Sequence, residues 1–318
     1  MLIAYTIVRR GLWSNRTVSK LKGKAIKMNF KKYVFQAMTF SMLISNITFA
    51  QSAAQSATQS TTQSTMGTST VQIKPPTKSD DKPLSVSLGL EMSESILKEE
   101  NAPKENSVSM LIAPVYKIND TFKASAKVIL NQDNFGQHET TASDVTLGLG
   151  IKGYKINESL KTTHSLGTIA PLSQNSVIRD RLKSQLSVSN GIAFSGNYFD
   201  LTYKLSLARN FHEYTQNAVG SANIEYRVSQ LLDLKIPVTE NFYLTSQGTY
   251  RIGSTYQGFN RYSFIFDADM NYDITQKLAA NIGTSNDGSA LKSNGTDSNI
   301  SAYNENTSVV RAGISYEY

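Results

Sequence analysis

The chain has 318 residues, of which 40% are hydrophobic and none is cysteine, so disulfides, thiolate metal sites and cysteine nucleophiles are excluded together. The first 50 residues hold nine basic residues and no acidic one; subtracting these nine from the total of 32 leaves 23 basic against 25 acidic residues in 51–318. The net charge of +7 therefore belongs to the N-terminal segment and gives no reason to expect a nucleic-acid partner.

The first 50 residues have the pattern of a secretory leader. The pattern is most compact from Met28, where two lysines precede a modest apolar stretch at 33–44 and a cleavage sequence ends at Ala50. We expect a leader at 1–50, with its signal core at 28–50 and cleavage after Ala50. The alternative is an uncleaved anchor, although no apolar run in the leader approaches the roughly 20 residues that a membrane helix needs.

Residues 51–82 are low in complexity. The segment begins QSAAQSATQSTTQST and continues through KPPTKSDDKP, so it is rich in Gln, Ser and Thr and marked by proline. Such a composition has little apolar surface to bury. We expect a disordered linker at 51–82 and an ordered domain at 83–318.

From about residue 84 the hydrophobic pattern has a period of two and keeps it to the end of the sequence. Apolar and polar residues alternate in 84–92, 122–130, 145–152 and 199–207. In the last of these, for example, Leu205 belongs to the apolar face and Lys204 to the polar face. A period of two over many short segments predicts an all-β domain.

The connections between these segments alternate in length. Short turns such as KIND, SGN and DITQK follow every second segment, and long polar loops follow the others. This asymmetry is typical of an outer-membrane barrel. The expected strands lie near Leu84, Val108, Thr121, Val145, Leu160, Leu182, Tyr198, Val219, Phe242, Asn260, Lys277 and Thr307.

The polar face of the segments favours a membrane over water as the surroundings of this domain. It consists of Ser, Thr, Gly and Asn with isolated charges, whereas the outer face of a soluble sandwich carries abundant charge. A closed barrel also satisfies every backbone hydrogen bond in lipid. The predicted fold is therefore an all-β, transmembrane, antiparallel up-and-down barrel of about 12 strands, and ten or fourteen strands are also compatible with the pattern.

The final residues, VVRAGISYEY, carry a resemblance to a known class. Apolar residues occupy alternate positions and the last residue is aromatic; the residues concerned are Ala312, Ile314, Tyr316 and Tyr318. With the alternation before it, 83–318 resembles a Gram-negative outer-membrane β-barrel protein of porin-like type. The resemblance implies an integral location in the bacterial outer membrane, contact with outer-membrane lipid, and a C-terminal signal read by the barrel assembly machinery.

Two motifs raise the alternative of an outer-membrane hydrolase. Outer-membrane phospholipases carry a His two residues before the Ser of a Ser-Asn-Gly motif; here Ser189, Asn190 and Gly191 are present, but Ser187 occupies the His position. Omptin-like proteases use paired aspartates, and Asp267 and Asp269 lie two residues apart. Ion-paired acids in the lumen explain this pair more simply.

We therefore expect a protein that is not an enzyme and that uses no metal or cofactor. GLGIKG, at 148–153, lacks the strand–turn–helix context of a phosphate-binding loop.

The polar face predicts the residues that line the lumen. The candidates are Lys123, Lys127, Lys152, Lys183, Lys204, Arg227, Arg251, Arg261, Arg311, Glu91, Asp200, Asp267 and Asp269. An excess of positive charge in a pore favours anions. The sequence thus predicts a porin-like channel for small solutes, with anion preference if the cations are not neutralised. A non-conducting surface barrel that binds a partner through its outer loops is the alternative.

Overall fold

The computed structural model describes residues 83–96, 106–134, 139–305 and 307–318. The expected leader with its cleavage site at Ala50, and the expected linker at 51–82, lie outside the described residues. Within these ranges no helix is long and apolar enough to cross a membrane.

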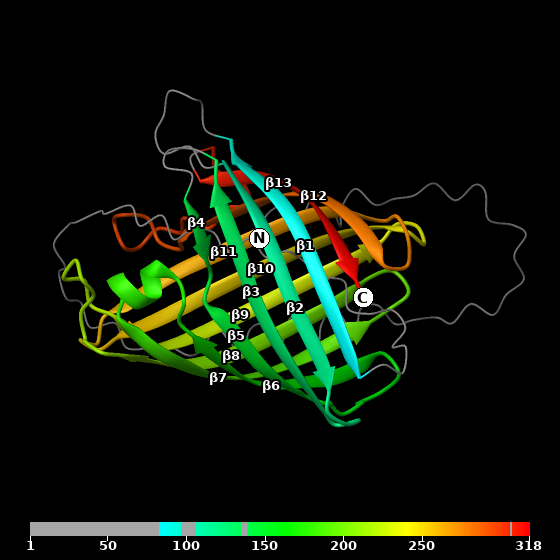
Figure 1. Ribbon diagram of the computed structural model, residues 1–318, viewed down its shortest axis with the longest axis horizontal. Coiled ribbons are helices and arrows are strands. Elements are labelled where there is room, and N and C mark those ends of the chain that lie inside the picture. The colour runs from blue at the N-terminus through cyan, green and yellow to red at the C-terminus, as the bar shows by residue number, and fades with distance from the viewer. Residues whose placement is uncertain (1–82, 97–105, 135–138, 306) are drawn as a thin grey trace, which may run out of the picture. The chain divides into compact units, whose positions relative to one another are not determined.

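The described chain is mostly β-strand and contains almost no helix (Figure 1). The strands are β1 (Leu84–Ser95), β2 (Asn106–Lys117), β3 (Phe122–Asp133), β4 (Thr140–Ala142), β5 (Val145–Ile151), β6 (Leu160–Ala170), β7 (Leu182–Ser195), β8 (Asp200–His212), β9 (Ile224–Pro237), β10 (Phe242–Thr255), β11 (Asn260–Asp273), β12 (Leu278–Ser289) and β13 (Ser308–Glu317). One short π-helical turn, η1 (Asn175–Arg179), precedes β7.

The strands form one antiparallel sheet that closes on itself. From β1 to β4 and from β5 to β13 each strand pairs with the next strand in the chain, and β13 pairs with β1. β4 and β5 both pair with β3, so they occupy a single position in the wall. Ser143 separates them, because its backbone N–H and its hydroxyl both bond to the backbone of Ile129. The barrel therefore has twelve wall positions, and the predicted fold class is confirmed.

The two faces of the wall differ as the alternation predicts. On β1, Leu90 is 45% exposed on the outer face, whereas the neighbouring Glu91 on the inner face is buried. On β13, Ile314 is 50% exposed on the outer face and Arg311 is 1% exposed on the inner face. An outer face rich in exposed aliphatic and aromatic side chains is stable only against lipid, and the polar groups gather inside.

The two ends of the barrel have different connections. Short turns lie at the end that also holds the start of β1 and the end of β13, and several are closed by a side chain, such as Asn119 Oδ1 accepting from the N–H groups of Thr121 and Phe122. The longer loops lie at the other end, where the connection between β10 and β11 is the one short turn among the described connections. The strand expected near Val219 is wrong by several residues, since β9 begins at Ile224. There, Asn217 Oδ1 accepts from the N–H groups of Val219 and Ser221 and so holds a loop.

Candidate functional site

One side of the lumen contains a buried ionic cluster. The Arg311 guanidinium lies with Nη1 3.0 Å from Asp267 Oδ1 and Nη2 2.8 Å from Asp269 Oδ2, while Nε donates to Asp269 Oδ1 at 3.0 Å. All three side chains are at most 1% exposed. The strand register explains the contact, because Asp269 of β11 and Arg311 of β13 both pair with Gly283 of β12. The glycine leaves space for the two side chains to meet over it.

More side chains fill the lumen beside this cluster. Buried Glu91 on β1 interacts electrostatically with Arg311 and with Lys127 on β3. Leu111 of β2 and Ile129 of β3 are a cross-strand pair that points inward and is almost fully buried. The lumen is therefore packed along β1–β3 and β11–β13.

The opposite wall carries short side chains. Its inward positions on β5–β8 include Gly148, Gly167, Ser187, Ser189 and Ser206, which are aligned by the strand register. The Ser189 and Ser206 hydroxyls bond to each other at 2.7 Å, so they lie flat along the wall. The side chains of this wall therefore fill less of the lumen than the charged and aliphatic side chains of the opposite wall.

Three predicted lumen cations follow on the adjacent strands. Lys204 of β8, Arg227 of β9 and Arg251 of β10 share the inward register, and among the described residues none of them makes an ion pair. Arg251 interacts electrostatically with Asp287 and Asp267 at longer range. Asp233 of β9 is an acid on the same wall. This wall thus presents three cations in close succession.

The other sequence-predicted candidates lie nearer the ends of the barrel. Lys123 and Asp200 are inward near the short turns, where Asp200 pairs with Lys235 in the strand register. Lys152 is exposed in the turn after β5, and Arg261 is exposed at the start of β11. Lys183 sits at a register shift, 64% exposed, with its ammonium 2.8 Å from Glu213. This ion pair lowers the pKa of Glu213. Lys152 and Lys183 are therefore not part of the inner wall.

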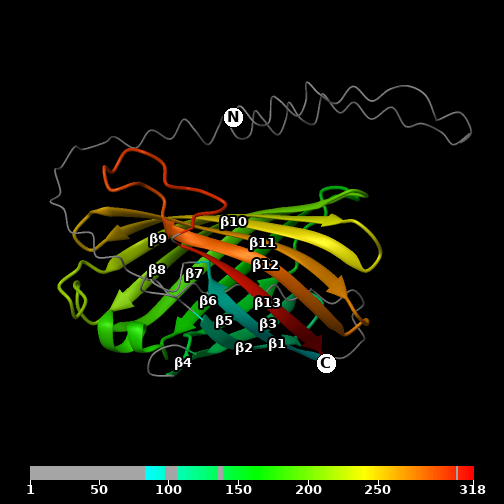
Figure 2. The same cartoon turned by 90° about the horizontal axis from the view of Figure 1, so that it is seen from above.

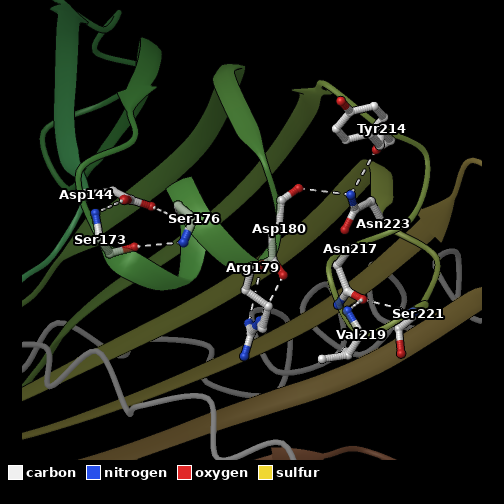
Figure 3. Close-up of polar contacts among 10 residues, drawn as sticks. All are labelled: Asp144, Ser173, Ser176, Arg179, Asp180, Tyr214, Asn217, Val219, Ser221 and Asn223. Atoms are coloured by element: carbon white, nitrogen blue, oxygen red, sulfur yellow. Dashed lines mark hydrogen bonds and ion pairs between the residues drawn. The ribbon is translucent and has the colours of Figure 1, made fainter.

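The outer loops contain a hydrogen-bonded network that the sequence analysis missed (Figure 3). Asp144, which precedes β5, accepts hydrogen bonds from the N–H groups of Leu172 and Ser173 and from the Ser176 hydroxyl. It thereby holds the segment containing η1 against the barrel rim. The available signal was an aspartate at the start of an alternating segment, followed by a polar loop with two serines three residues apart.

A second part of the network joins two loops. Asn223 Nδ2 donates to the carbonyl oxygens of Asp180 and Tyr214, and Ala218 N–H donates to Arg179 O at 2.7 Å. Figure 3 shows Asp180 and Tyr214 on either side of the Asn223 amide. The loops at 171–181 and 213–223 therefore form one supported rim.

The residues of the two hydrolase motifs are not arranged as a catalytic site would need. Ser189 points into the lumen, whereas Asn190 is on the outer face, where its Oδ1 lies 2.8 Å from His164 Nδ1. Asp267 and Asp269 are both ion-paired with Arg311. Among the described residues, no group of acidic and histidine side chains is arranged to hold a metal ion.

The C-terminal residues complete the wall. Ala312, Ile314 and Tyr316 face outward on β13 and pair with β1 and β12. The backbone of Tyr318 continues this pairing, because its N–H donates to Val86 O at 3.0 Å. Tyr318 therefore extends the pairing between β13 and β1 that closes the barrel.

A closed antiparallel barrel, apolar outside and polar inside, is the architecture of an integral outer-membrane protein. The sequence matches no protein-family profile and no curated protein sequence. The structure is similar to an outer-membrane channel from Pseudomonas putida F1, with a TM-score of 0.50, 11% identity and coverage of 74% of this chain and 95% of the channel. It is also similar to the NanC porin, with a TM-score of 0.49, 10% identity and coverage of 73% and 98%. The predicted porin-like fold and outer-membrane location are confirmed.

Proposed function

We propose that the chain is a porin-like channel that passes small solutes and prefers anions. The observation that carries this proposal is the unequal filling of the lumen. Charged and aliphatic side chains pack one side, around Arg311 and Leu111, whereas the inner wall of β5–β8 carries Gly and Ser. A path for solutes along the short side chains would be narrow, in keeping with the size of a twelve-stranded barrel.

The anion preference rests on how the lumen charges are paired. Asp267 and Asp269 share the single positive charge of Arg311, while Lys204, Arg227 and Arg251 lie beside the path without an ion pair in the described part of the chain. Cationic side chains next to a narrow path lower the electrostatic barrier for anions and raise it for cations. Asp233, on the same wall, and the one negative charge that Arg311 leaves uncompensated on the Asp267 and Asp269 pair reduce this effect without cancelling three charges.

Ion selectivity tests the proposal. In planar bilayers with a KCl gradient, the wild type should show a reversal potential of the sign set by chloride. The double variant Arg227→Gln/Arg251→Gln should move that potential toward zero. Arg209→Gln is the matched control, because Arg209 faces outward, lies over the Tyr226 ring and is ion-paired with Glu225. Cation selectivity of the wild type, or an unchanged potential in the double variant, would contradict the anion preference.

The second candidate is a barrel that binds a partner at its outer surface. The supported rim favours it, since loops tied together by Asp144 and Asn223 are suited to a fixed binding surface. Leu172, Ile178 and Val219 are exposed on this rim. A refolded barrel that inserts into bilayers but gives no conductance at any voltage would favour this function over the channel.

We also propose that the barrel assembly machinery reads the C-terminal strand. Deleting Tyr318 should leave export intact but lower the yield of folded barrel in cells, whereas Tyr318→Phe should preserve it. Tyr116→Ala is the control, because Tyr116 is another exposed outward aromatic near the same end of the barrel. An equal yield for the deletion and the wild type would show that Tyr318 serves only as part of the wall.

A further inference from the structure

A groove of about 460 Å³ lies on the outer surface of the barrel over β9–β12, strands that are seen side by side in Figure 2. It is lined by Ile236, Leu244, Met270, Ile282, Ser246 and Ala268. Ser246 and Ala268 are a cross-strand pair, and both are small. They form the floor of a depression between the larger aliphatic side chains.

The position of the groove along the barrel axis indicates which part of the membrane surrounds it. Leu244 lies two residues from the start of β10, and Met270 lies three residues from the end of β11, so both are close to the short-turn end. In an outer-membrane barrel this end faces the periplasm, and the wall here meets the inner leaflet. The exposed surface of the groove is almost wholly apolar, although Thr245, Asp269 and Thr284 also line it, and an apolar surface suits an acyl chain. A second barrel would present a convex wall, which cannot enter a narrow groove.

A lysine and several tyrosines lie at the short-turn end beside the groove, where Asp273 and Glu317 line the same hollow as Lys277. The Lys277 ammonium, in the turn between β11 and β12, is 5.7 Å from the centroid of the Tyr318 ring. Tyr272 and Tyr316, on the adjoining strands, are exposed on the outer face. Lys and Tyr at this level are typical of residues that meet lipid headgroups. Thr284, which pairs with Ala268 of the groove floor, lies seven residues from Lys277 along the chain, which is about 23 Å of extended strand.

We propose that the groove and Lys277 form a binding site for one phospholipid of the inner leaflet. One acyl chain occupies the groove over Ser246 and Ala268, and the headgroup phosphate contacts the Lys277 ammonium. The separation of the two parts along β12 matches a lipid whose phosphate is at the boundary and whose chain runs toward the membrane centre. The site is on the outside of the wall, so it is independent of conduction through the lumen.

Native mass spectrometry of the detergent-purified barrel, titrated with phosphatidylethanolamine, tests the acyl-chain part of the site. The wild type should retain one lipid. Ala268→Leu and Ser246→Leu, which fill the groove from two different strands, should each weaken retention about tenfold. Ala126→Leu is the matched control, because Ala126 also faces outward but lies on β3, away from the groove. Each variant is first shown to be folded by its mobility on a gel without boiling.

The phosphate part is tested with Lys277→Gln and with different ligands. Lys277→Gln should weaken retention of phosphatidylethanolamine and phosphatidylglycerol about fivefold. Diacylglycerol, which has no phosphate, should bind the wild type and Lys277→Gln equally, and inorganic phosphate alone should not displace the lipid. The proposal would be overturned if Ala126→Leu lost as much lipid as the groove variants, or if both groove variants retained lipid as the wild type does. It would also be overturned if Lys277→Gln did not change lipid retention, or if the protein were a dimer that carried no lipid.

Discussion

Replacing Arg311 with methionine should lower the free energy of unfolding of the barrel by about 3 to 5 kcal/mol. Methionine keeps much of the length of the arginine stem but removes the charge that meets Asp267 and Asp269. Both carboxylates are almost fully buried, so they would be left in the lumen wall without their cation. Urea titration of the barrel in phospholipid vesicles, followed by the folded band on a gel without boiling, measures this loss.

Two comparisons separate the ionic cluster from a general effect of losing a lumen arginine. Arg251→Met removes an inward arginine that makes no ion pair in the described part of the chain, and it should cost about 1 kcal/mol or less. Adding Asp269→Asn to Arg311→Met should recover about 0.5 to 3 kcal/mol, because it removes a charge that has lost its partner. If Arg311→Met and Arg251→Met are equally stable, water reaches the cluster and the lumen is not packed there.

Gly283→Ala offers an independent route to the same cluster without changing any charge. A Cβ on Gly283 would overlap Asp269 Oδ1 and the backbone oxygen of Ala268. The carboxylate would then have to move away from Arg311. We expect a loss of stability in the same direction as that of Arg311→Met.

The sequence predicts which face of a strand a residue occupies, because alternation depends only on neighbouring residues. Leu90 and Glu91 on β1, and Ile314 and Arg311 on β13, lie on the expected faces. The strand count follows for the same reason, since each strand has its own alternating segment. The break between β4 and β5 was not predictable from alternation, because it depends on hydrogen bonds that Ser143 exchanges with Ile129 of another strand.

Contacts across the lumen could not be predicted in this way. Arg311 meets Asp269 over Gly283 because of the register of three strands, and the two charged residues are 42 positions apart in the chain. A list of inward residues therefore cannot show which charges neutralise each other. The outer rim was missed for a related reason, since the bonds of Asp144 and Asn223 connect loops rather than residues of one strand.

Leu207→Arg should lower the free energy of unfolding by about 2 to 4 kcal/mol in phospholipid bilayers, because the arginine would face lipid near the middle of the membrane. Leu207 is 55% exposed on the outer wall of β8, and its cross-strand neighbours are Val188 and Val228. Leu207 gives a clearer test than Leu205, the other apolar position in the middle of β8. The cross-strand neighbours of Leu205 are Asn190 and Gln230, whose side-chain amides could hydrogen-bond an introduced guanidinium.

The matched control is Ser206→Arg, which places the same side chain one position away, on the inner wall. Ser206 lies opposite Ser189 among short, polar side chains of the inner wall, where we expect a guanidinium to be accommodated. We expect this variant to unfold at nearly the same urea concentration as the wild type and to change conductance instead. If Leu207→Arg and Ser206→Arg were equally stable, the outer wall would be in contact with water or protein. The exposed aliphatic side chains of β8 would then need a partner other than lipid.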